Sequence, residues 1–270
     1  MDRLQNKVAI VTGGGGGIGG CVVRRLVSEG AKVVVADISL DAARAVADPL
    51  GGHALAIAFD ATDSESVKAM VDRCVDHFGR LDILHNNAAM SDPAKHLLDS
   101  DAVDIPIAVW DEVMDINVRG YLLGCRFAIP RMIESGGGSI INTASNSGVA
   151  GDLSRIAYGS SKGAIITMTK YVATQHGQQN IRCNSISPGV VLTEALDRNA
   201  PGLKEIIKRH ILTPEFGTGD DIAALVAFLA SDESRYITAE NISISGGGLQ
   251  HQPHMADLID YMAKAMSQAE

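Results

Sequence analysis

The sequence predicts an α/β protein with a single Rossmann-like, doubly wound parallel sheet of about seven strands and helices on both faces. Short apolar runs alternate with segments of helical periodicity along most of the chain, and the runs are almost continuously apolar, as in strands buried on both faces. The first run ends in five consecutive glycines at 13–17, and a helical pattern follows directly. With 270 residues, of which 46% are hydrophobic, we expect residues 1–270 to form one domain.

The elements can be placed in order from apolar periodicity and capping residues. For example, Asp63 or Ser64 can cap a helix whose apolar residues recur on one face. We expect strands at 7–11, 33–36, 54–59, 81–85, 139–142, 181–186 and 242–244, and helices at 18–27, 42–50, 64–78, 108–134, 157–178 and 220–229. Outside this alternation lie an irregular segment at 90–108, a helical excursion at 193–212 that can close as a substrate lid, and a C-terminal extension at 251–270.

Charge and composition exclude several classes of function. The formal charge of −9 argues against a nucleic-acid partner, because phosphate binding needs clustered Lys and Arg. No apolar run reaches transmembrane length and the start lacks a signal core, so we expect no membrane contact, no secretion and a cytoplasmic location. The four cysteines are scattered, which predicts free thiols. We expect no metal site, and we expect His251 and His254 to be solvated on a polar tail.

Tyr158 and Lys162 are the pair on which a reaction can be built. Four residues apart in a predicted helix, the phenol and the ammonium lie side by side on one face. A phenol titrates near pH ~10 and alone is a poor base, but a neighbouring cation favours its ionised form. It can then exchange a proton with an alcohol or carbonyl oxygen. Taken alone, the motif is more often a surface tyrosine over a lysine stem.

The glycines and Asp37 predict a dinucleotide site. A glycine turn lets the backbone approach a pyrophosphate at the start of the next helix, although the register stays open between Gly14-x-Gly16-x-x-Gly19 and Gly13-x-x-x-Gly17-x-Gly19. Asp37 ends the second strand, where a carboxylate can accept hydrogen bonds from ribose hydroxyls and would repel a 2′-phosphate. We therefore expect NAD rather than NADP. The alternatives are a flexible loop and an aspartate that caps a helix near Ser39.

The chain resembles the short-chain dehydrogenase/reductase family, of the NAD-dependent type, because these motifs and several others occur in the order and spacing that the family shows. The resemblance covers about residues 5–250. Ala89 departs from the Gly that the family usually has there, and the 90–108 segment and the tail fall outside the shared pattern. The residues that carry the resemblance are Thr12-Gly13-x-x-x-Gly17-Ile18-Gly19, Asp60, Asn86-Asn87-Ala88, Asn117, Ser145, Tyr158-x-x-x-Lys162 and Pro188-Gly189-x-x-x-Thr193.

The resemblance implies catalytic roles. Tyr158 would be the general acid/base, Lys162 would favour its ionised form and hold the nicotinamide ribose, and Ser145 would orient the substrate oxygen. Asn117 would hold a water that relays protons, its alternative being an ordinary polar residue in a helix kink.

The resemblance also implies a cofactor site. Asp60 would bind the adenine edge, Asn87 would lie against the adenosine-side ribose, and the Val191 backbone and Thr193 would fix the carboxamide, although Thr193 could equally cap a helix. The implied cofactor-binding residues are Gly13, Gly17, Ile18, Gly19, Asp37, Asp60, Ala61, Asn87, Ala88, Tyr158, Lys162, Pro188, Val191 and Thr193.

The expected function is an NAD-dependent alcohol dehydrogenase or ketoreductase, acting as a homotetramer on an apolar, cyclic secondary alcohol or ketone. The alternatives are an NADP-dependent carbonyl reductase and a non-catalytic dinucleotide-binding sensor or scaffold. We expect Lys95, Arg155 and Arg198 near the pocket to be solvated in loops, the alternative being that they bind a charged group of the substrate. The apolar helical face of 255–266 should pack against its own subunit or a neighbour. The expected substrate-pocket residues are Met90, Ser147, Leu153, Ile156, Val190 and Leu196.

Overall fold

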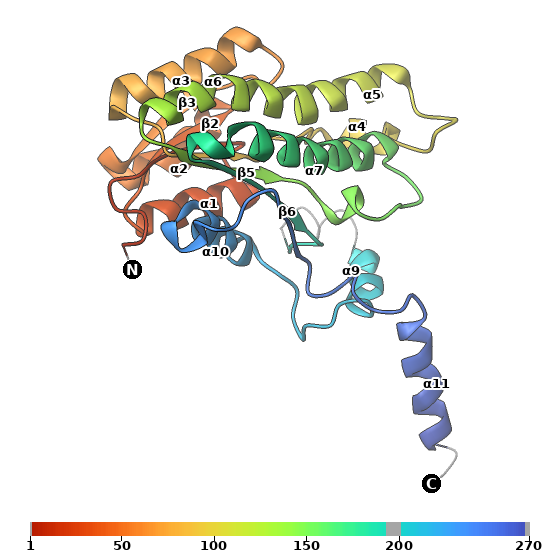
Figure 1. Ribbon diagram of the computed structural model, residues 1–270. Helices are drawn as coiled ribbons and strands as arrows, with labels where there is room; N and C mark the ends of the chain where they lie inside the picture. The colour runs from red at the N-terminus through yellow and green to blue at the C-terminus, as the bar shows by residue number, and fades with distance from the viewer. Residues whose placement is uncertain (1, 193–200, 268–270) are drawn as a thin grey trace.

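The computed structural model describes residues 2–192 and 201–267, and its centre is one seven-stranded sheet in which every strand pairs in parallel (Figure 1). The strand order is β3-β2-β1-β4-β5-β6-β7, so the chain winds outward from β1 in one direction and then in the other. This confirms the predicted doubly wound fold. The strands are β1 (Val8–Thr12), β2 (Lys32–Asp37), β3 (Ala54–Ala58), β4 (Ile83–Asn86), β5 (Gly138–Thr143), β6 (Ile181–Pro188) and β7 (Asn241–Ile244).

Successive side chains of each strand point to opposite faces of the sheet, so they pack into two hydrophobic cores, one on each face. On β1, Val8 and Ile10 enter the first core, whereas Ala9 and Val11 enter the second. Both faces are thus buried, which explains why the strands read as continuous apolar runs. The helices that cover the first face are α3 (Ser64–Phe78), α6 (Gly120–Glu134) and α7 (Ile156–His176), and those that cover the second are α1 (Gly17–Ser28), α2 (Leu40–Ala47) and α10 (Gly219–Ala230).

The long helix predicted over 108–134 is present, but its hydrogen-bond pattern changes in the middle. α5 (Ile107–Met114) continues into α6 through a π-helical turn, η2 (Asp115–Arg119). The 90–108 segment, predicted to be irregular, contains a short helix, α4 (Pro93–Leu98). Asp92 caps it by accepting a hydrogen bond from Ala94 N at 2.9 Å, and Pro93 takes the first helical position. A helix of six residues is too short to show a periodic pattern of apolar residues in the sequence.

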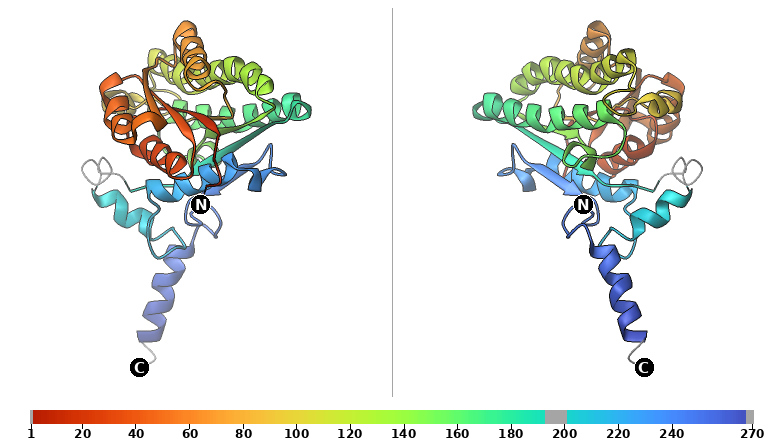
Figure 2. Two further views of the ribbon diagram at one scale, coloured as in Figure 1. Left: turned by 90° about the vertical axis from the view of Figure 1, so that its left-hand side faces the viewer. Right: turned by 90° about the vertical axis from the view of Figure 1, so that its right-hand side faces the viewer.

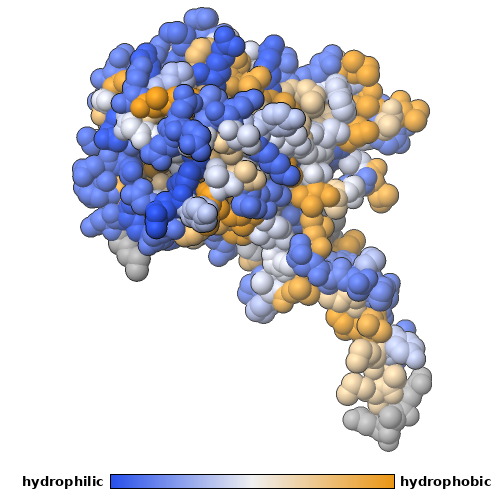
Figure 3. All heavy atoms as spheres, viewed as in Figure 1, coloured by the Kyte–Doolittle hydropathy of each residue, from blue (hydrophilic) through white to orange (hydrophobic). Residues whose placement is uncertain are grey.

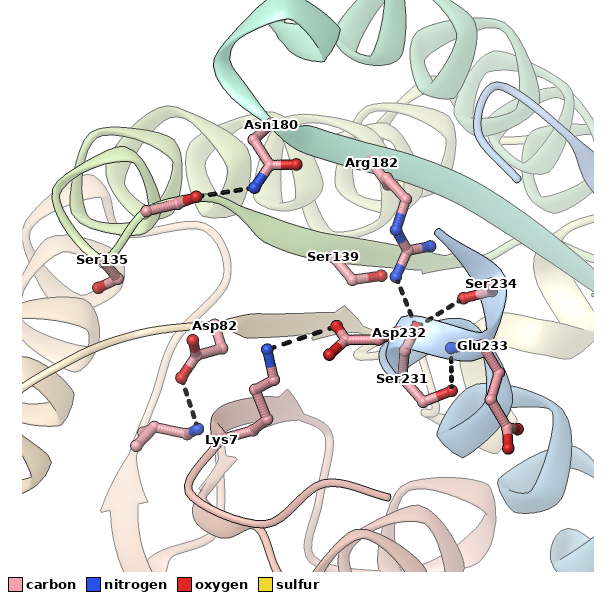
Figure 4. Close-up of polar contacts among 12 residues, drawn as sticks. Lys7, Asp82, Ser135, Ser139, Asn180, Arg182, Ser231, Asp232, Glu233 and Ser234 are labelled. Atoms are coloured by element: carbon pink, nitrogen blue, oxygen red, sulfur yellow. Dashed lines mark hydrogen bonds and ion pairs between the residues drawn. The ribbon is translucent and has the colours of Figure 1, made fainter. Parts of the chain in front are cut away.

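The amino ends of the strands are closed by polar contacts (Figure 4). Asp82 Oδ2 accepts a hydrogen bond from the main chain of β1 at 2.9 Å, and Lys7 Nζ lies 3.6 Å from Asp232 Oδ1. Arg182 Nη2 donates to Ser231 O at 3.2 Å, which joins β6 to the end of α10. The strand-end residues of the predicted site, such as Asp37, Asn87 and Ser145, lie at the opposite, carboxyl edge, where open α/β sheets bind their ligands.

Two helices lie outside the sheet layers, α9 (Pro201–Lys208) and α11 (Met255–Ser267). Figure 2 shows α11 projecting away from the body of the molecule, and Figure 3 shows apolar side chains along it. Arg209 ties the first turns of α11 to the segment after α9, with hydrogen bonds to Ala256 O at 3.3 Å and Asp260 Oδ2 at 2.5 Å. Residues 261–267 are all exposed. Within residues 2–192 and 201–267, no helix combines the length and apolar character needed to cross a bilayer.

Candidate active site

The carboxyl edge of the sheet gathers residues from both halves of the chain. All seven parallel strands end at this edge. The glycine turn follows β1, Asp37 ends β2, and Asn87, Ser145 and the segment after Pro188 follow β4, β5 and β6. α7 reaches the same edge, because Lys162 Nζ donates a hydrogen bond at 2.7 Å to the carbonyl oxygen of Thr143, the last residue of β5. The predicted cofactor and catalytic groups therefore share one side of the sheet.

The glycine turn leaves the start of α1 open to a ligand. Gly13 and Gly17 have positive φ angles of 63° and 52°, which favour glycine. A Cβ at Gly13 would lie 3.0 Å from Ala88 Cα, and one at Gly19 would lie 2.0 Å from Gly13 O. Gly16 and Gly17 instead face open space, and α1 has neither a side-chain cap nor an acidic residue in its first turn. Free N–H groups beside open space fit the pyrophosphate of a dinucleotide.

Asp37 links the glycine turn to the start of α2. Its Oδ2 accepts a hydrogen bond from Gly15 N at 3.0 Å, and its Oδ1 accepts one from Ser39 N at 3.0 Å. Ser39 itself caps α2 by accepting a hydrogen bond from Ala42 N at 3.2 Å. The alternative interpretation of Asp37 as the capping residue is therefore wrong, because Ser39 caps α2 and Asp37 holds Ser39 N. The carboxylate is half-buried and keeps lone pairs that can accept from ribose hydroxyls.

The loops after β3 and β4 are fixed by short-range polar contacts. Asp60 Oδ1 accepts hydrogen bonds from the N–H and hydroxyl of Thr62 at 2.8 and 2.7 Å, and Ala61 is buried. Asn87 Nδ2 donates to Thr12 O at 3.1 Å, and Thr12 Oγ1 accepts from the N–H groups of Asn87 and Ala88 at 2.9 and 3.1 Å. These bonds join the loop after β4 to the end of β1. Ile18, half-buried, packs against the second core.

His85 and Thr143 belong to the same edge and were not among the predicted site residues. His85 is fully buried, with Nε2 2.9 Å from Thr143 Oγ1. Burial, and then the charge of Lys162, lowers the pKa of His85 to about 3, so the imidazole is neutral. Thr143 Oγ1 donates weakly to Asn87 Oδ1 at 3.5 Å. Thr143 could have been examined as a strand-end residue close to Ser145, whereas nothing in the sequence singles out His85 within its apolar strand.

Lys162 is buried beside the ring of Tyr158. Its side chain is 1% exposed, and Nζ lies 5.5 Å from the centre of the Tyr158 ring and 5.4 Å from that of Tyr121. Desolvation, and then the positive charge of Arg155, lowers the pKa of Lys162 to about 7. An ammonium that titrates near neutral pH can both donate and recover a proton, which suits a proton relay.

Asn117 lies in the π-helical turn and connects two loops of the site. It is fully buried, its Oδ1 accepts a hydrogen bond from Met90 N at 3.0 Å, and its Nδ2 donates to Ser161 Oγ at 2.9 Å. Ser161 Oγ donates in turn to Tyr158 O at 2.7 Å. The side chain thus positions α7, and the π-helical turn is a feature that recurs at functional sites.

Ser145 follows β5 and begins a short 3₁₀ turn at Asn146–Gly148. Its half-buried hydroxyl accepts a hydrogen bond from Ser147 N at 3.2 Å. A Cβ at Gly148 would lie 2.6 Å from the main chain of Lys162, so this turn rests directly on α7. The contact brings the loop of Ser145 against the helix that carries Tyr158.

Asp99 fixes the start of α7 and was missed by the sequence analysis. Its carboxylate is 2% exposed and accepts hydrogen bonds from Ala157 N at 2.9 Å and Tyr158 N at 3.0 Å. Arg155 N also donates to Asp99 O at 2.8 Å. These bonds satisfy the first N–H groups of the helix and hold the main chain of Tyr158. Because Asp99 and Tyr158 are far apart in sequence, no local motif could reveal the contact.

The residues predicted to line a substrate pocket are not all brought together. Ser147, Leu153 and Ile156 border a hollow of about 530 Å³ beside α7. Its lining mixes apolar residues with serines and charged side chains, which differs from the apolar lining expected. Met90 is instead buried in a small core cluster below the site, Val190 lies partly exposed after β6, and Leu196 lies outside the described residues.

The segment after β6 is described only as far as residue 192. Pro188 ends β6, and Val191 forms a bridge with Gly217, next to which Leu192 N donates to Gly217 O at 2.9 Å. Thr193 and the first part of the predicted 193–212 excursion lie outside the described residues. Among the described residues, no group of three or more His, Cys, Asp and Glu side chains is suited to hold a metal ion.

Comparison with known proteins gives consistent matches. A family model described as enoyl-(acyl carrier protein) reductase matches residues 14–248. A probable short-chain type dehydrogenase/reductase of Bradyrhizobium diazoefficiens is 43% identical, over 95% of this chain and 92% of its own. A 7α-hydroxysteroid dehydrogenase of Bacteroides fragilis is 38% identical, over 94% and 98%. A D-threitol dehydrogenase of Mycolicibacterium smegmatis is 36% identical, over 91% and 94%.

Proposed function

The chain belongs to the short-chain dehydrogenase/reductase family of oxidoreductases, and we propose that it transfers hydride between a secondary alcohol or ketone and NAD. The observation that carries this proposal is the placement of buried Lys162 beside the Tyr158 ring, at the sheet edge that also holds the open glycine turn. Proton exchange and dinucleotide binding are thereby possible at one site.

In the proposed mechanism, the nicotinamide supplies the hydride acceptor for alcohol oxidation. Tyr158 removes the hydroxyl proton, and protonated Lys162 beside its ring provides a positive charge close to the site of proton exchange. Ser145 orients the substrate oxygen from the end of β5. Asn117 has both side-chain polar atoms engaged by protein, so a relay water held by this residue would bind its main-chain carbonyl.

The proposed cofactor is NAD rather than NADP. The N–H groups at the start of α1 would hold the pyrophosphate, and Asp37 would accept from the ribose hydroxyls and repel a 2′-phosphate. Asp60 makes its two side-chain hydrogen bonds through Oδ1, which leaves Oδ2 for the adenine edge. Lys162 and the Val191 backbone would bind the nicotinamide half.

For the substrate, we propose an apolar, cyclic secondary alcohol or its ketone. The similarity to a hydroxysteroid dehydrogenase and the apolar part of the hollow, such as Val149, Leu153 and Ile156, support this class. The similarity to a D-threitol dehydrogenase makes polyols the necessary comparison. A series of cyclic alcohols of increasing size should give rising kcat/KM, whereas higher values for polyols would contradict an apolar substrate.

We also propose a homotetramer located in the cytoplasm. The unpaired state of all four cysteines is consistent with a reducing compartment. The apolar face of α11 supports an oligomer, because from Leu258 onward it is not covered by its own subunit: Ile259 is 57% and Met262 56% exposed.

The test of the reaction is Tyr158→Phe, which removes only the hydroxyl that exchanges the proton. Turnover with NAD and an accepted alcohol should fall at least a thousandfold, while NAD binding, measured by fluorescence titration, should change less than threefold. Tyr171→Phe is the matched control, because Tyr171 lies on the same helix and is 64% exposed. Retention of a rate within tenfold of wild type would rule out Tyr158 as the acid/base.

A further inference from the structure

Arg155 is a basic residue of the site edge whose charge the proposed reaction does not use. Of the three cations that were expected to be solvated, Lys95 forms an ion pair with Glu112, and Arg198 lies outside the described residues. Arg155 has no carboxylate within ion-pair distance in the part of the chain that the structure describes. It is half-buried rather than solvated.

The conformation of Arg155 brings its guanidinium onto the catalytic tyrosine. It precedes α7 with left-handed backbone angles, φ 66° and ψ 43°, which are uncommon for a residue other than glycine and concentrate at functional sites. Its Cζ lies 4.1 Å from the centre of the Tyr158 ring. Arg155 also borders the 530 Å³ hollow, which Tyr158 does not, so its side chain contacts both the hollow and the Tyr158 ring.

Within residues 2–192 and 201–267, no group accepts a hydrogen bond from this guanidinium. Its Nε is buried and has no hydrogen-bond partner among the described residues. A buried N–H without an acceptor is unfavourable, so an acceptor supplied by a ligand is expected. A guanidinium that stacks on a ring by its face still presents its edge, where parallel N–H groups match the two oxygens of a carboxylate.

Among the described residues, no charged group near Arg155 forms an ion pair with it. Asp101 and Asp152 border the same hollow, but both are exposed and accept main-chain hydrogen bonds instead. The carboxylate of Asp99 is already committed to the N–H groups of Ala157 and Tyr158. Burial, and then the charge of Arg155, lowers the pKa of His96, which disfavours a further positive charge at this imidazole; neither of its forms can neutralise Arg155. Lys162 adds a second positive charge when protonated. The edge of the site next to Tyr158 therefore favours a negatively charged group on the ligand.

We propose that Arg155 binds a carboxylate of the substrate, which is then a cyclic secondary alcohol or ketone with an anionic group a few bonds from the reacting carbon. The short spacing follows from the contact between the guanidinium and the Tyr158 ring, because the proton is exchanged at the hydroxyl of that same ring. This inference rests on the proposed oxidoreductase function, and it changes the proposed substrate from an uncharged apolar ring to an apolar ring that carries one anionic group.

The test compares 3-hydroxycyclohexane-1-carboxylate with its methyl ester, two substrates that share the ring and the reacting carbon and differ in charge. In wild type, kcat/KM for the acid should exceed that for the ester at least tenfold, and this ratio should fall towards one in Arg155→Met. Arg155→Lys keeps the charge but not the paired N–H groups, so its ratio should lie in between. Arg73→Met, at an exposed position of α3, should keep the wild-type ratio.

The ratio separates recognition of the anion from positioning of Tyr158. If Arg155 only orients the tyrosine ring, both substrates lose rate equally in Arg155→Met and the ratio stays constant, which would overturn the proposal. An acid-to-ester ratio near one in wild type would overturn it as well. Failure of the proposed function looks different, because neither the acid, the ester nor uncharged cyclic alcohols would then reduce NAD. If Arg155→Met does not fold, as judged by circular dichroism, Arg155→Lys and the wild-type ratio still decide the outcome.

Discussion

Asp37 holds two main-chain N–H groups and still presents a carboxylate beside the open start of α1. If this charge rejects a 2′-phosphate, wild type should prefer NAD over NADP at least tenfold in kcat/KM, about 1.4 kcal/mol of transition-state stabilisation. Asp37→Asn keeps the shape of the side chain and removes its charge, at the loss of one of the two main-chain hydrogen bonds, so the preference should shrink. Asp41→Asn, an exposed change in the first turn of α2, is the control. Equal efficiency of wild type with both cofactors would contradict the role given to Asp37.

Lys162 makes stability depend on pH in the cofactor-free protein. Its pKa is lowered from 10.5 to about 7 by burial and by Arg155, so between these values the unfolded chain binds the extra proton. The free energy of unfolding should therefore rise with pH above about 7, by at most ~1.4 kcal/mol per unit from this group. Lys162→Met should lose that contribution, and the exposed Lys170→Met should keep it. Urea unfolding at pH 6.5, 7.5 and 8.5 measures it, and a parallel pH profile for wild type and Lys162→Met would contradict it.

Single residues differ in how far the sequence could reveal them. Tyr158, Lys162 and Asp37 could be predicted because their partners are set by local spacing or by the end of a strand. Asp99 could not be predicted, because it lies in an irregular segment far in sequence from α7, the helix whose first N–H groups it binds. Arg155 was expected to be solvated, since its contact with Tyr158 depends on a left-handed backbone conformation that the sequence does not indicate.

At the level of elements, the strands and the long helices agree with the predicted ranges, because each has enough residues to show its period. The helix α4 was missed because its six residues are too few to show a helical period. The π-helical turn was also missed, since it keeps the helix continuous and changes only the hydrogen-bond register around Asn117. Sequence patterns thus predicted the scaffold better than the local distortions that shape the site.

His251 connects the C-terminal extension to the segment after α9, although it was expected to be solvated. Its Nδ1 lies 2.9 Å from Gln252 O and its Nε2 lies 2.8 Å from His210 O. Both partners are carbonyl oxygens, so only the protonated imidazole, with two N–H groups, can donate to both. These carbonyls, Gln252 first and then His210, raise the pKa of His251. The nearby charged residues, Arg209 and Asp260, pair with each other.

The expected consequence is a contact that weakens as pH rises. A raised pKa in the folded state means that the stabilisation is complete below the ordinary value of 6.5 and is lost as pH rises through the folded value. In an NMR titration, the pKa of His251 should lie above the ordinary value of 6.5, with His251→Gln assigning its signal. A pKa of His251 at or below 6.5 would show that the two carbonyls do not hold the protonated ring.

For the whole molecule, α11 is the feature that a single copy leaves unexplained. A helix of 13 residues is marginal in water on its own, and beyond Asp260 this one has no buried side chain. Its apolar residues nevertheless recur on one face, including Leu258, Ile259, Met262 and Met266. This face was expected to pack either on its own subunit or on a neighbour. Because residues 258–266 are not covered by their own subunit, we expect a second copy of the chain to cover them.

Light scattering should therefore find a tetramer for wild type. Ile259→Glu combined with Met262→Glu places two charges in the middle of the apolar face and should shift the protein to smaller species, because an unpaired charge is costly to bury in an interface. Lys264→Glu changes charge on the other side of the same helix and should leave the tetramer intact. The first prediction to check is the wild-type mass: a monomer at micromolar concentration would show that the exposed face of α11 serves no assembly of this chain. If the double variant remains a tetramer, the subunits must associate through other surfaces, and the apolar face of α11 would then need a different explanation.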